Sequence, residues 1–180
     1  MQNSLEYKTN FLFYKKYHKN KYNILVHIFC IPSIVWSTFC IVNCIGYING
    51  LDQQSNFKYT PSILVYGSYM GYYYTIARSE LFWQTFHFYL MILISANINY
   101  SYNYNKIMYY LIIQILSWKL QILSHRHFEG NSPALLSGIS QSLLTAPIFI
   151  VDEIFQYAPW IKFDLIGMVY RLYLCHNRCN

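Results

Sequence analysis

Long apolar stretches alternate with short polar segments along the 180 residues of the chain. Four stretches contain no Asp, Glu, Lys or Arg: they lie between Lys21 and Asp52, between Lys58 and Arg78, between Glu80 and Lys106, and between Glu129 and Asp152. A transmembrane helix needs about 20 predominantly apolar residues. The pattern therefore predicts an all-α, polytopic helical membrane protein.

The polar breaks divide the apolar sequence into four expected spanning helices, which cover residues 23–44, 61–77, 81–97 and 107–123. A fifth apolar stretch, residues 133–151, contains Gly138 and Pro147, and it either crosses the membrane or enters it and returns as a hairpin. The hairpin is favoured because irregular backbone is tolerated at membrane depth where it lines a buried cavity. Residues 1–180 then form one membrane domain with an interfacial arm (1–22), a helical bundle (23–155) and an interfacial tail (156–180).

Composition agrees with a membrane location, since 55% of the residues are hydrophobic and 11% are charged, whereas soluble domains average about 45–50% and 25%. The formal net charge is +6, and lysines alternate with aromatic residues in the arm 1–22. Such a mixture suits the membrane interface, with rings at headgroup level and lysines near anionic lipid. We therefore expect membrane lipid, and no nucleic acid, as the partner of the arm. The positive-inside rule places the side of the membrane that carries the basic arm in the cytoplasm or its topological equivalent.

A polar segment at residues 125–129 interrupts the apolar pattern with His125, His127 and Glu129. Imidazole and carboxylate groups are costly to hold in apolar surroundings unless they are paired or bind a metal. If the segment is helical, His125 and Glu129 share a face because they are four residues apart. The spacing fits half of a divalent-metal site, and it fits a salt bridge or hydrogen bond equally well.

Two further histidines lie near the start of the first long apolar stretch: His18 precedes it, and His27 lies in its opening turns. On one straight helix a separation of nine residues puts them on opposite faces, so they can meet only if the chain bends. Asn20 and Asn23 offer such a break, with Asn23 a candidate N-cap. Asn23 would then share a face with His27 and orient its imidazole. Four crossings return the chain to its starting side, so His125 should lie on the same face of the membrane.

The three histidines and Glu129 lie within two longer sequence blocks. Residues 13–37 read FYKKYHKNKYNILVHIFCIPSIVWS, and residues 121–155 read QILSHRHFEGNSPALLSGISQSLLTAPIFIVDEIF. Together they resemble the two signatures of the fungal 2-hydroxy fatty acid dioxygenases, in which a Gln, a His, a Phe-Glu, a Pro-Ala-Leu and an Ala-Pro followed by a Glu recur at this spacing. The chain departs from the family at Ser124, where the family has glycine before its histidine.

The resemblance implies an endoplasmic reticulum membrane enzyme that uses Fe(II) and O₂ to shorten a 2-hydroxy long-chain fatty acid by one carbon. The family's histidines fall on His18, His27 and His125, as expected metal ligands, and its carboxylates fall on Glu129 and Glu153, as expected catalytic groups. Histidine and carboxylate ligands with open positions suit non-haem Fe(II). Around them we expect Asn23 and Gln121 as supporting residues, and Lys19 and Arg126 as residues that attract the substrate carboxylate.

A second hypothesis is of a different class: a non-catalytic accessory subunit of a large membrane complex, such as a respiratory complex in the mitochondrial inner membrane, that keeps the same fold. The aromatic-rich apolar composition suits a lipid-facing subunit equally well. Other membrane subunits would then be its partners. Metal content and co-purification with a large complex discriminate between the two hypotheses.

Overall fold

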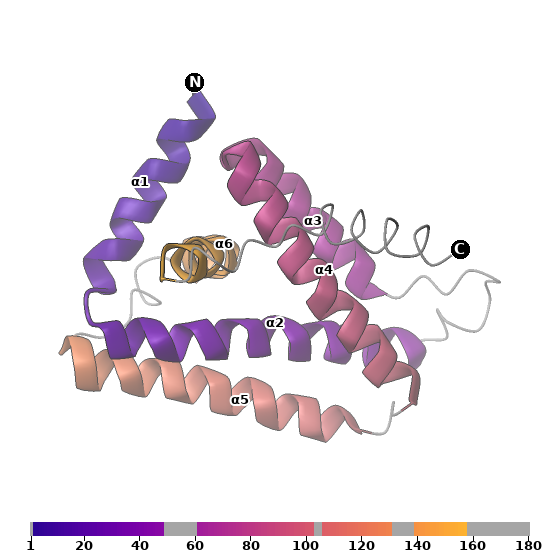
Figure 1. Cartoon of the computed structure of the whole chain (residues 1–180). Helices are drawn as coiled ribbons and strands as arrows, with labels where there is room; N and C mark the ends of the chain where they lie inside the picture. Colours follow the sequence, from indigo (N-terminus) through magenta and orange to yellow (C-terminus); the bar gives the residue numbers. More distant parts are fainter. Residues whose placement is uncertain (1, 49–60, 103–105, 131–138, 158–180) are drawn as a thin grey trace, which may run out of the picture.

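The computed structural model describes residues 2–48, 61–102, 106–130 and 139–157, and the described chain is helical apart from short connections (Figure 1). The helices are α1 (Gln2–Tyr17), α2 (Lys21–Ile48), α3 (Pro61–Ile76), α4 (Ser79–Tyr102), α5 (Ile107–Ser124), the π-helix η2 (His125–Glu129) and α6 (Ile139–Tyr157). The expected all-α class is confirmed for these residues. Most of the expected tail, from residue 158 onward, and the start of the apolar stretch, residues 133–138, lie outside the described residues.

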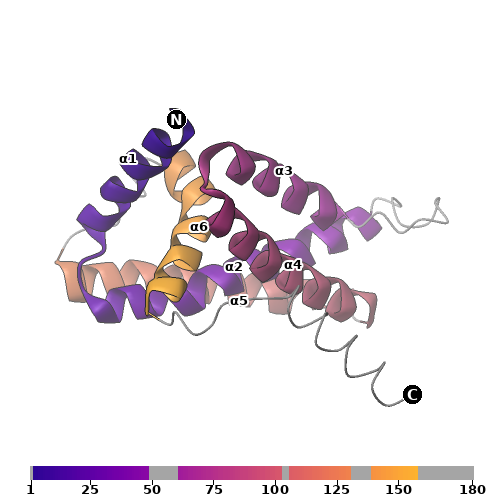
Figure 2. The same ribbon diagram turned by 45° about the horizontal axis from the view of Figure 1, so that its top comes forward.

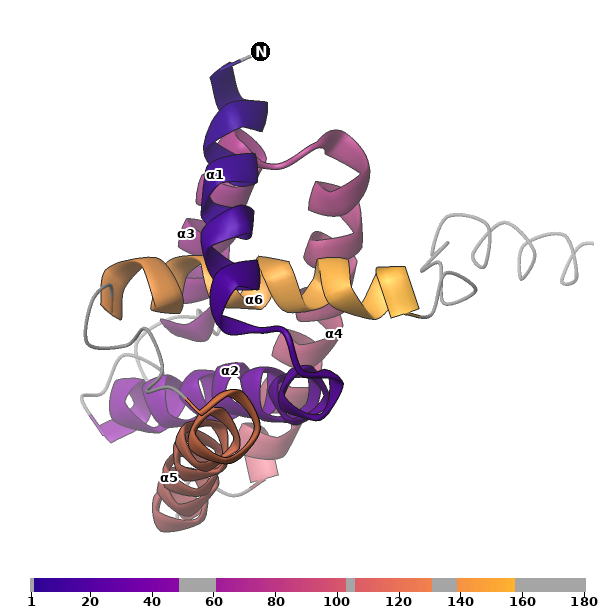
Figure 3. The same cartoon turned by 90° about the vertical axis from the view of Figure 1, so that its left-hand side faces the viewer.

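Helix α2 is the centre of the bundle, since it contacts α3, α4, α5 and α6. Helix α5 lies along α2, and α3 and α4 pack on each other beside it (Figures 1 and 2). Helix α6 is seen end-on in Figure 1, between α1 on one side and the α3–α4 pair on the other. Figure 3 shows α6 from the side, running across the bundle. The N-terminal end of α2 and the C-terminal end of α5 meet at one end of the molecule.

The structure corrects the number of spans. Three helical stretches among the described residues are long and apolar enough to cross a membrane: Lys21–Tyr47, Ser79–Asn99 and Ile107–Glu129. The expected span 61–77 is helix α3, whose 16 residues reach only about 24 Å at 1.5 Å per residue, short of the roughly 30 Å of hydrocarbon in a bilayer. The prediction of four spans is therefore wrong.

The apolar stretch 133–151 also differs from expectation. Its described part belongs to α6, one continuous helix of 19 residues that passes through Pro147. It is therefore neither a hairpin within the described residues nor one of the three helices that qualify as spans. The expected break at Pro147 is therefore absent, whereas Gly138 lies outside the described residues.

Tyrosines from neighbouring helices explain how α6 continues through Pro147. Proline has no N–H, so the carbonyl of Leu143, four residues earlier, loses its helical partner. Tyr69 donates a hydrogen bond to this carbonyl at 3.3 Å, and Tyr73 donates to the next carbonyl, that of Leu144, at 2.8 Å. Tyr89 donates to the carbonyl of Pro147 itself at 3.1 Å. The Tyr69 hydroxyl thus replaces the donor that Pro147 lacks, and the other two tyrosines add contacts to nearby carbonyls; neighbouring groups compensate for prolines in membrane helices in a similar way.

Helix α1 is held against α6 by rings and by paired charges. Tyr7 is buried and donates a hydrogen bond to Asp152 Oδ2 at 2.7 Å. Its ring and that of Tyr14 both pack against Phe149. Further along α1, Lys15 forms an ion pair with Glu153, whose side chain is 1% exposed. The basic arm is therefore packed against the bundle, and its position relative to a membrane interface stays a prediction.

Candidate metal centre and the adjoining cavity

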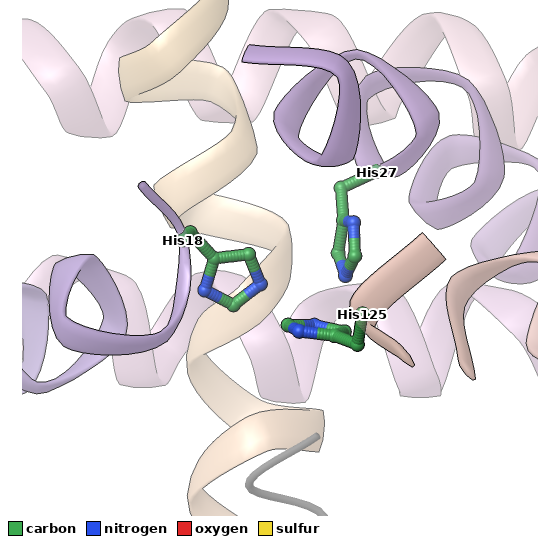
Figure 4. Close-up of side chains that lie close together, drawn as sticks. All are labelled: His18, His27 and His125. Atoms are coloured by element: carbon green, nitrogen blue, oxygen red, sulfur yellow. The ribbon is translucent and has the colours of Figure 1, made fainter. Parts of the chain in front are cut away.

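The side chains of three histidines from distant parts of the chain lie close together (Figure 4). His18 lies in the connection between α1 and α2, His27 in α2, and His125 at the start of η2. One nitrogen from each ring lies within 4.8 Å of the others, and the three centroid separations are 4.7, 4.7 and 4.9 Å. The prediction that they meet is confirmed, although the crossing count from which it was derived is not.

The bend that brings His18 to His27 is a helix break at Asn20. Helix α1 ends at Tyr17 and α2 begins at Lys21. The side-chain oxygen of Asn20 accepts a hydrogen bond from the backbone N–H of Tyr22 at 2.9 Å, which is the contact of an N-cap residue. The expected cap at Asn23 is therefore wrong: Asn23 lies in the first turn of α2, with none of its surface exposed.

Backbone carbonyls fix the orientation of two of the imidazoles. Nδ1 of His18 lies 2.8 Å from the carbonyl oxygen of Tyr14, and Nδ1 of His27 lies 2.9 Å from that of Asn23. A carbonyl only accepts, so each Nδ1 carries the proton and each Nε2 keeps a lone pair. Metal-bound histidines are held in this way in many proteins. Asn23 thus supports His27 as expected from the sequence, but through its backbone rather than its side chain.

The chemistry of the three rings fits a metal ion. Metal ligation requires neutral imidazole, and burial lowers the pKa of His18 to about 3, which keeps the ring neutral at physiological pH. Nδ1 of His125 is buried and has no hydrogen-bond partner among the described residues. An unpaired buried nitrogen is costly, and a metal ion would use its lone pair. Imidazole ligands are common to iron, zinc, copper and nickel sites.

The side chains of His125 and Glu129 both belong to helix η2 but contact different residues. Single-turn π-helices are rare and occur frequently at functional sites, and here the turn ends at Gly130, whose φ of 67° is a left-handed conformation that favours glycine. His125 points to the other two histidines, whereas the carboxylate of Glu129 is bonded elsewhere. The carboxylate is outside the group of three histidines that can share an ion.

Glu129 joins η2 to the beginning of α2. Its Oε1 accepts hydrogen bonds from the backbone N–H groups of Lys19 and Asn20, both at 2.9 Å, and from Nδ2 of Asn23 at 3.1 Å. The side-chain oxygen of Asn23 in turn accepts from the hydroxyl of Ser124 at 2.7 Å. Asn23 therefore connects the end of α5 to Glu129. Because His18 directly precedes Lys19, this network also positions His18.

An apolar cavity of about 230 Å³ begins at the three histidines. Its lining residues on α2 run from His27 to Phe39, and those along α5 and η2 run from Gln114 to His125. At 1.5 Å per residue these faces extend about 18 Å and 16 Å. Aromatic and aliphatic side chains of α3 and α6, such as Tyr69 and Phe149, complete the walls. The cavity is therefore elongated, with the three histidines at one end.

Of the remaining predicted site residues, one lines the cavity and two do not. Gln121 lines the cavity and is 7% exposed. Lys19 and Arg126 are exposed and do not line it. The sequence analysis missed Gln114 and Trp118, although with Gln121 and His125 they recur every three or four residues, which is the signal of one helix face.

Comparison with known proteins shows to which family the chain is similar. The family model described as "Mpo1-like: 2-hydroxy-palmitic acid dioxygenase Mpo1-like" matches residues 4–157. A curated protein of Saccharomyces cerevisiae, 2-hydroxy-palmitic acid dioxygenase MPO1, is 26% identical over 149 residues, which cover 83% of this chain and 79% of the yeast protein. No solved structure matches the chain significantly.

Proposed function

The chain belongs to the Mpo1-like family, and from this premise we propose that it is a membrane-bound, Fe(II)-dependent dioxygenase that shortens 2-hydroxy long-chain fatty acids by one carbon. The observation that carries the proposal is the meeting of three imidazoles at the end of an elongated apolar cavity. The imidazoles suit a metal ion, and the cavity suits an acyl chain. The family resemblance suggests the endoplasmic reticulum membrane as the location.

In this proposal His18, His27 and His125 hold Fe(II). When bound, iron supplies the sites at which O₂ and the oxygens of the 2-hydroxy acid are activated for cleavage next to the carboxylate. The reaction balances without a further reductant, since a 2-hydroxy acid and O₂ give the acid shortened by one carbon, CO₂ and water. No 2-oxoglutarate is required for this stoichiometry.

The cavity orients the substrate and keeps water away from its chain. The carbon chain would lie along α2 and α5, between residues such as Ile31, Val35 and Trp118. Burial of this chain supplies most of the binding free energy, at about 0.8 kcal/mol per CH₂ group. The hydroxy acid end is then left at the histidines, which is the part of the molecule that reacts.

The charged residues of the site have supporting roles in the proposal. Glu129 holds the connection that carries His18. Glu153 pairs with Lys15 and fixes the last turns of α1, which precede His18. Lys19 and Arg126 are exposed near the same end of the bundle, where they would attract the carboxylate of an approaching fatty acid. The catalytic role that the resemblance implies for Glu129 and Glu153 stays a prediction.

Turnover by the purified protein tests the function. Iron-loaded protein in detergent should convert 2-hydroxypalmitic acid and O₂ to the acid shortened by one carbon, measured by mass spectrometry, and His27→Ala should abolish the product. His127→Ala is the matched control, because His127 is exposed and outside the group of three. Absence of product from well-folded, iron-loaded protein would contradict the proposal and favour the accessory-subunit hypothesis.

A further inference from the structure

Most polar side chains that line the cavity are already bonded to the protein. Tyr66, Tyr69, Tyr73, Tyr89 and Thr38 donate their hydroxyl protons to backbone carbonyls. With its amide oriented to satisfy its neighbours, Gln114 donates to Ser37 and accepts from the indole N–H of Trp118 at 3.2 Å. These groups complete the walls and have little capacity left for a ligand.

Gln121 differs from these residues. It lies on the same face of α5, one turn before His125, and lines the cavity with only 7% of its surface exposed. Its Nε2 is fully buried and has no hydrogen-bond partner among the described residues. A buried amide without a partner is destabilising, and native proteins retain few of them. An unpaired donor beside the three histidines therefore points to a ligand that accepts a hydrogen bond.

The side-chain amide of Gln121 does not hold the ring of His125 in this structure. Nδ1 of His125 and Nε2 of Gln121 both lack partners among the described residues, so the two are not bonded to each other. The sequence predicted that Gln121 would support a metal ligand, and the free amide indicates a different role. Its donor remains available to a molecule inside the cavity.

Apart from the three histidines, the described lining of the cavity has no basic side chain to pair with an anionic ligand. The residues around the cavity include no lysine or arginine among those described, and Lys19 and Arg126 are exposed. A carboxylate that enters must therefore find neutral donors in addition to any metal. A hydrogen bond from a neutral amide to an ionised acceptor is stronger than one between two neutral groups.

We propose that Gln121 binds the substrate, donating a hydrogen bond from its side-chain amide to the carboxylate of the 2-hydroxy fatty acid. This inference rests on the proposed function and adds a residue that distinguishes an acid from a neutral lipid with the same chain. The contact also fixes the orientation of the bound acid. It holds the carboxylate one helical turn from His125, and the carbon chain then lies along α2 and α5.

Equilibrium binding to the metal-free protein tests the proposal without relying on turnover. The two probes are 2-hydroxyhexadecanoic acid and hexadecane-1,2-diol, which share the chain and the 2-hydroxyl group but differ in the carboxylate. Dissociation constants are measured in detergent for the wild type, Gln121→Met and Gln114→Met. Gln114→Met is the matched control, because it makes the same change on the same face of α5 at an amide that already has partners.

Gln121→Met should weaken binding of the acid about 10- to 100-fold, the range for a lost hydrogen bond to a charged group, and should change binding of the diol less than about threefold. Gln114→Met should affect both probes alike. Equal losses for the two probes in Gln121→Met, or an unchanged affinity for the acid, would overturn the proposal. Iron content and turnover of the wild-type protein after loading with Fe(II), measured separately, show whether the proposed function stands.

Discussion

Replacing Glu129 tests whether its carboxylate holds the site together or takes part in the chemistry. One of its oxygens accepts three hydrogen bonds, from the N–H groups of Lys19 and Asn20 and from the side chain of Asn23. Glu129→Ala removes all three, whereas Glu129→Gln keeps an oxygen in the same place and loses only the charge. The two variants therefore separate geometry from charge.

The structure gives the expected magnitudes. Hydrogen bonds to charged groups contribute about 1.5–3 kcal/mol each, but the bond to Lys19 is exposed and that to Asn20 partly so, and water can replace them in part. Glu129→Ala should therefore lower the free energy of unfolding by about 2–4 kcal/mol. Glu129→Gln should cost only about 1 kcal/mol, because it loses the charge near the N-terminus of α2. Since His18 is next to Lys19, Glu129→Ala should also weaken iron binding about 10- to 100-fold.

The assay combines thermal unfolding of detergent-solubilised protein, competition for iron with a chelator, and turnover at saturating iron. If the carboxylate positions His18, Glu129→Gln retains most of the activity and Glu129→Ala loses it together with iron affinity. A Glu129→Gln variant that binds iron normally and has no activity would refute the positioning role. It would show that the charge acts in the reaction, as the sequence suggested.

Two further predictions concern stability. Tyr73→Phe should lower the free energy of unfolding by about 1–2 kcal/mol, because the hydrogen bond from the buried Tyr73 to the carbonyl of Leu144 is lost; Tyr74→Phe, at a residue 73% exposed, should have almost no effect, and equal effects of the two changes would contradict the role given to Tyr73. The pKa of His18 is lowered by burial from 6.5 to about 3, so the unfolded chain binds more protons between these values. The metal-free protein should therefore lose stability as the pH falls below 6.5, with His18 contributing up to about 1.4 kcal/mol per pH unit; His18→Gln should reduce this slope in thermal unfolding measured from pH 7 to 5, and an unchanged slope would show that His18 does not titrate in this way.

Part of the histidine cluster was predictable because its geometry follows from local rules. His18 and His27 are nine residues apart, so a shared site required a bend, and Asn20 was one of two residues able to provide it. The structure places the bend there. The convergence of His125 with these residues was predicted from four membrane crossings, and this count does not explain it, because only three helices among the described residues qualify as spans.

Other features depend on contacts between distant segments. Glu129 binds backbone groups 109 and 110 positions earlier in the chain, so spacing around His125 suggested a shared helix face but gave no information on this partner. Local sequence predicts a break at Pro147 because Tyr69, which supplies the missing donor to Leu143, lies 74 residues before that acceptor. The apolar run containing α3 had the composition of a span but forms a helix of only 16 residues.

Iron stoichiometry is the most direct test of the central claim that the three histidines hold iron. Protein purified in detergent would be loaded anaerobically with Fe(II), freed of excess metal and analysed for elemental content, with the double variant His27→Ala, His125→Ala and the single variant His127→Ala beside it. We predict about one iron per chain in the wild type and in His127→Ala, and none in the double variant, because three imidazoles form one site. A folded wild-type protein without iron, or a double variant that retains it, would contradict the account.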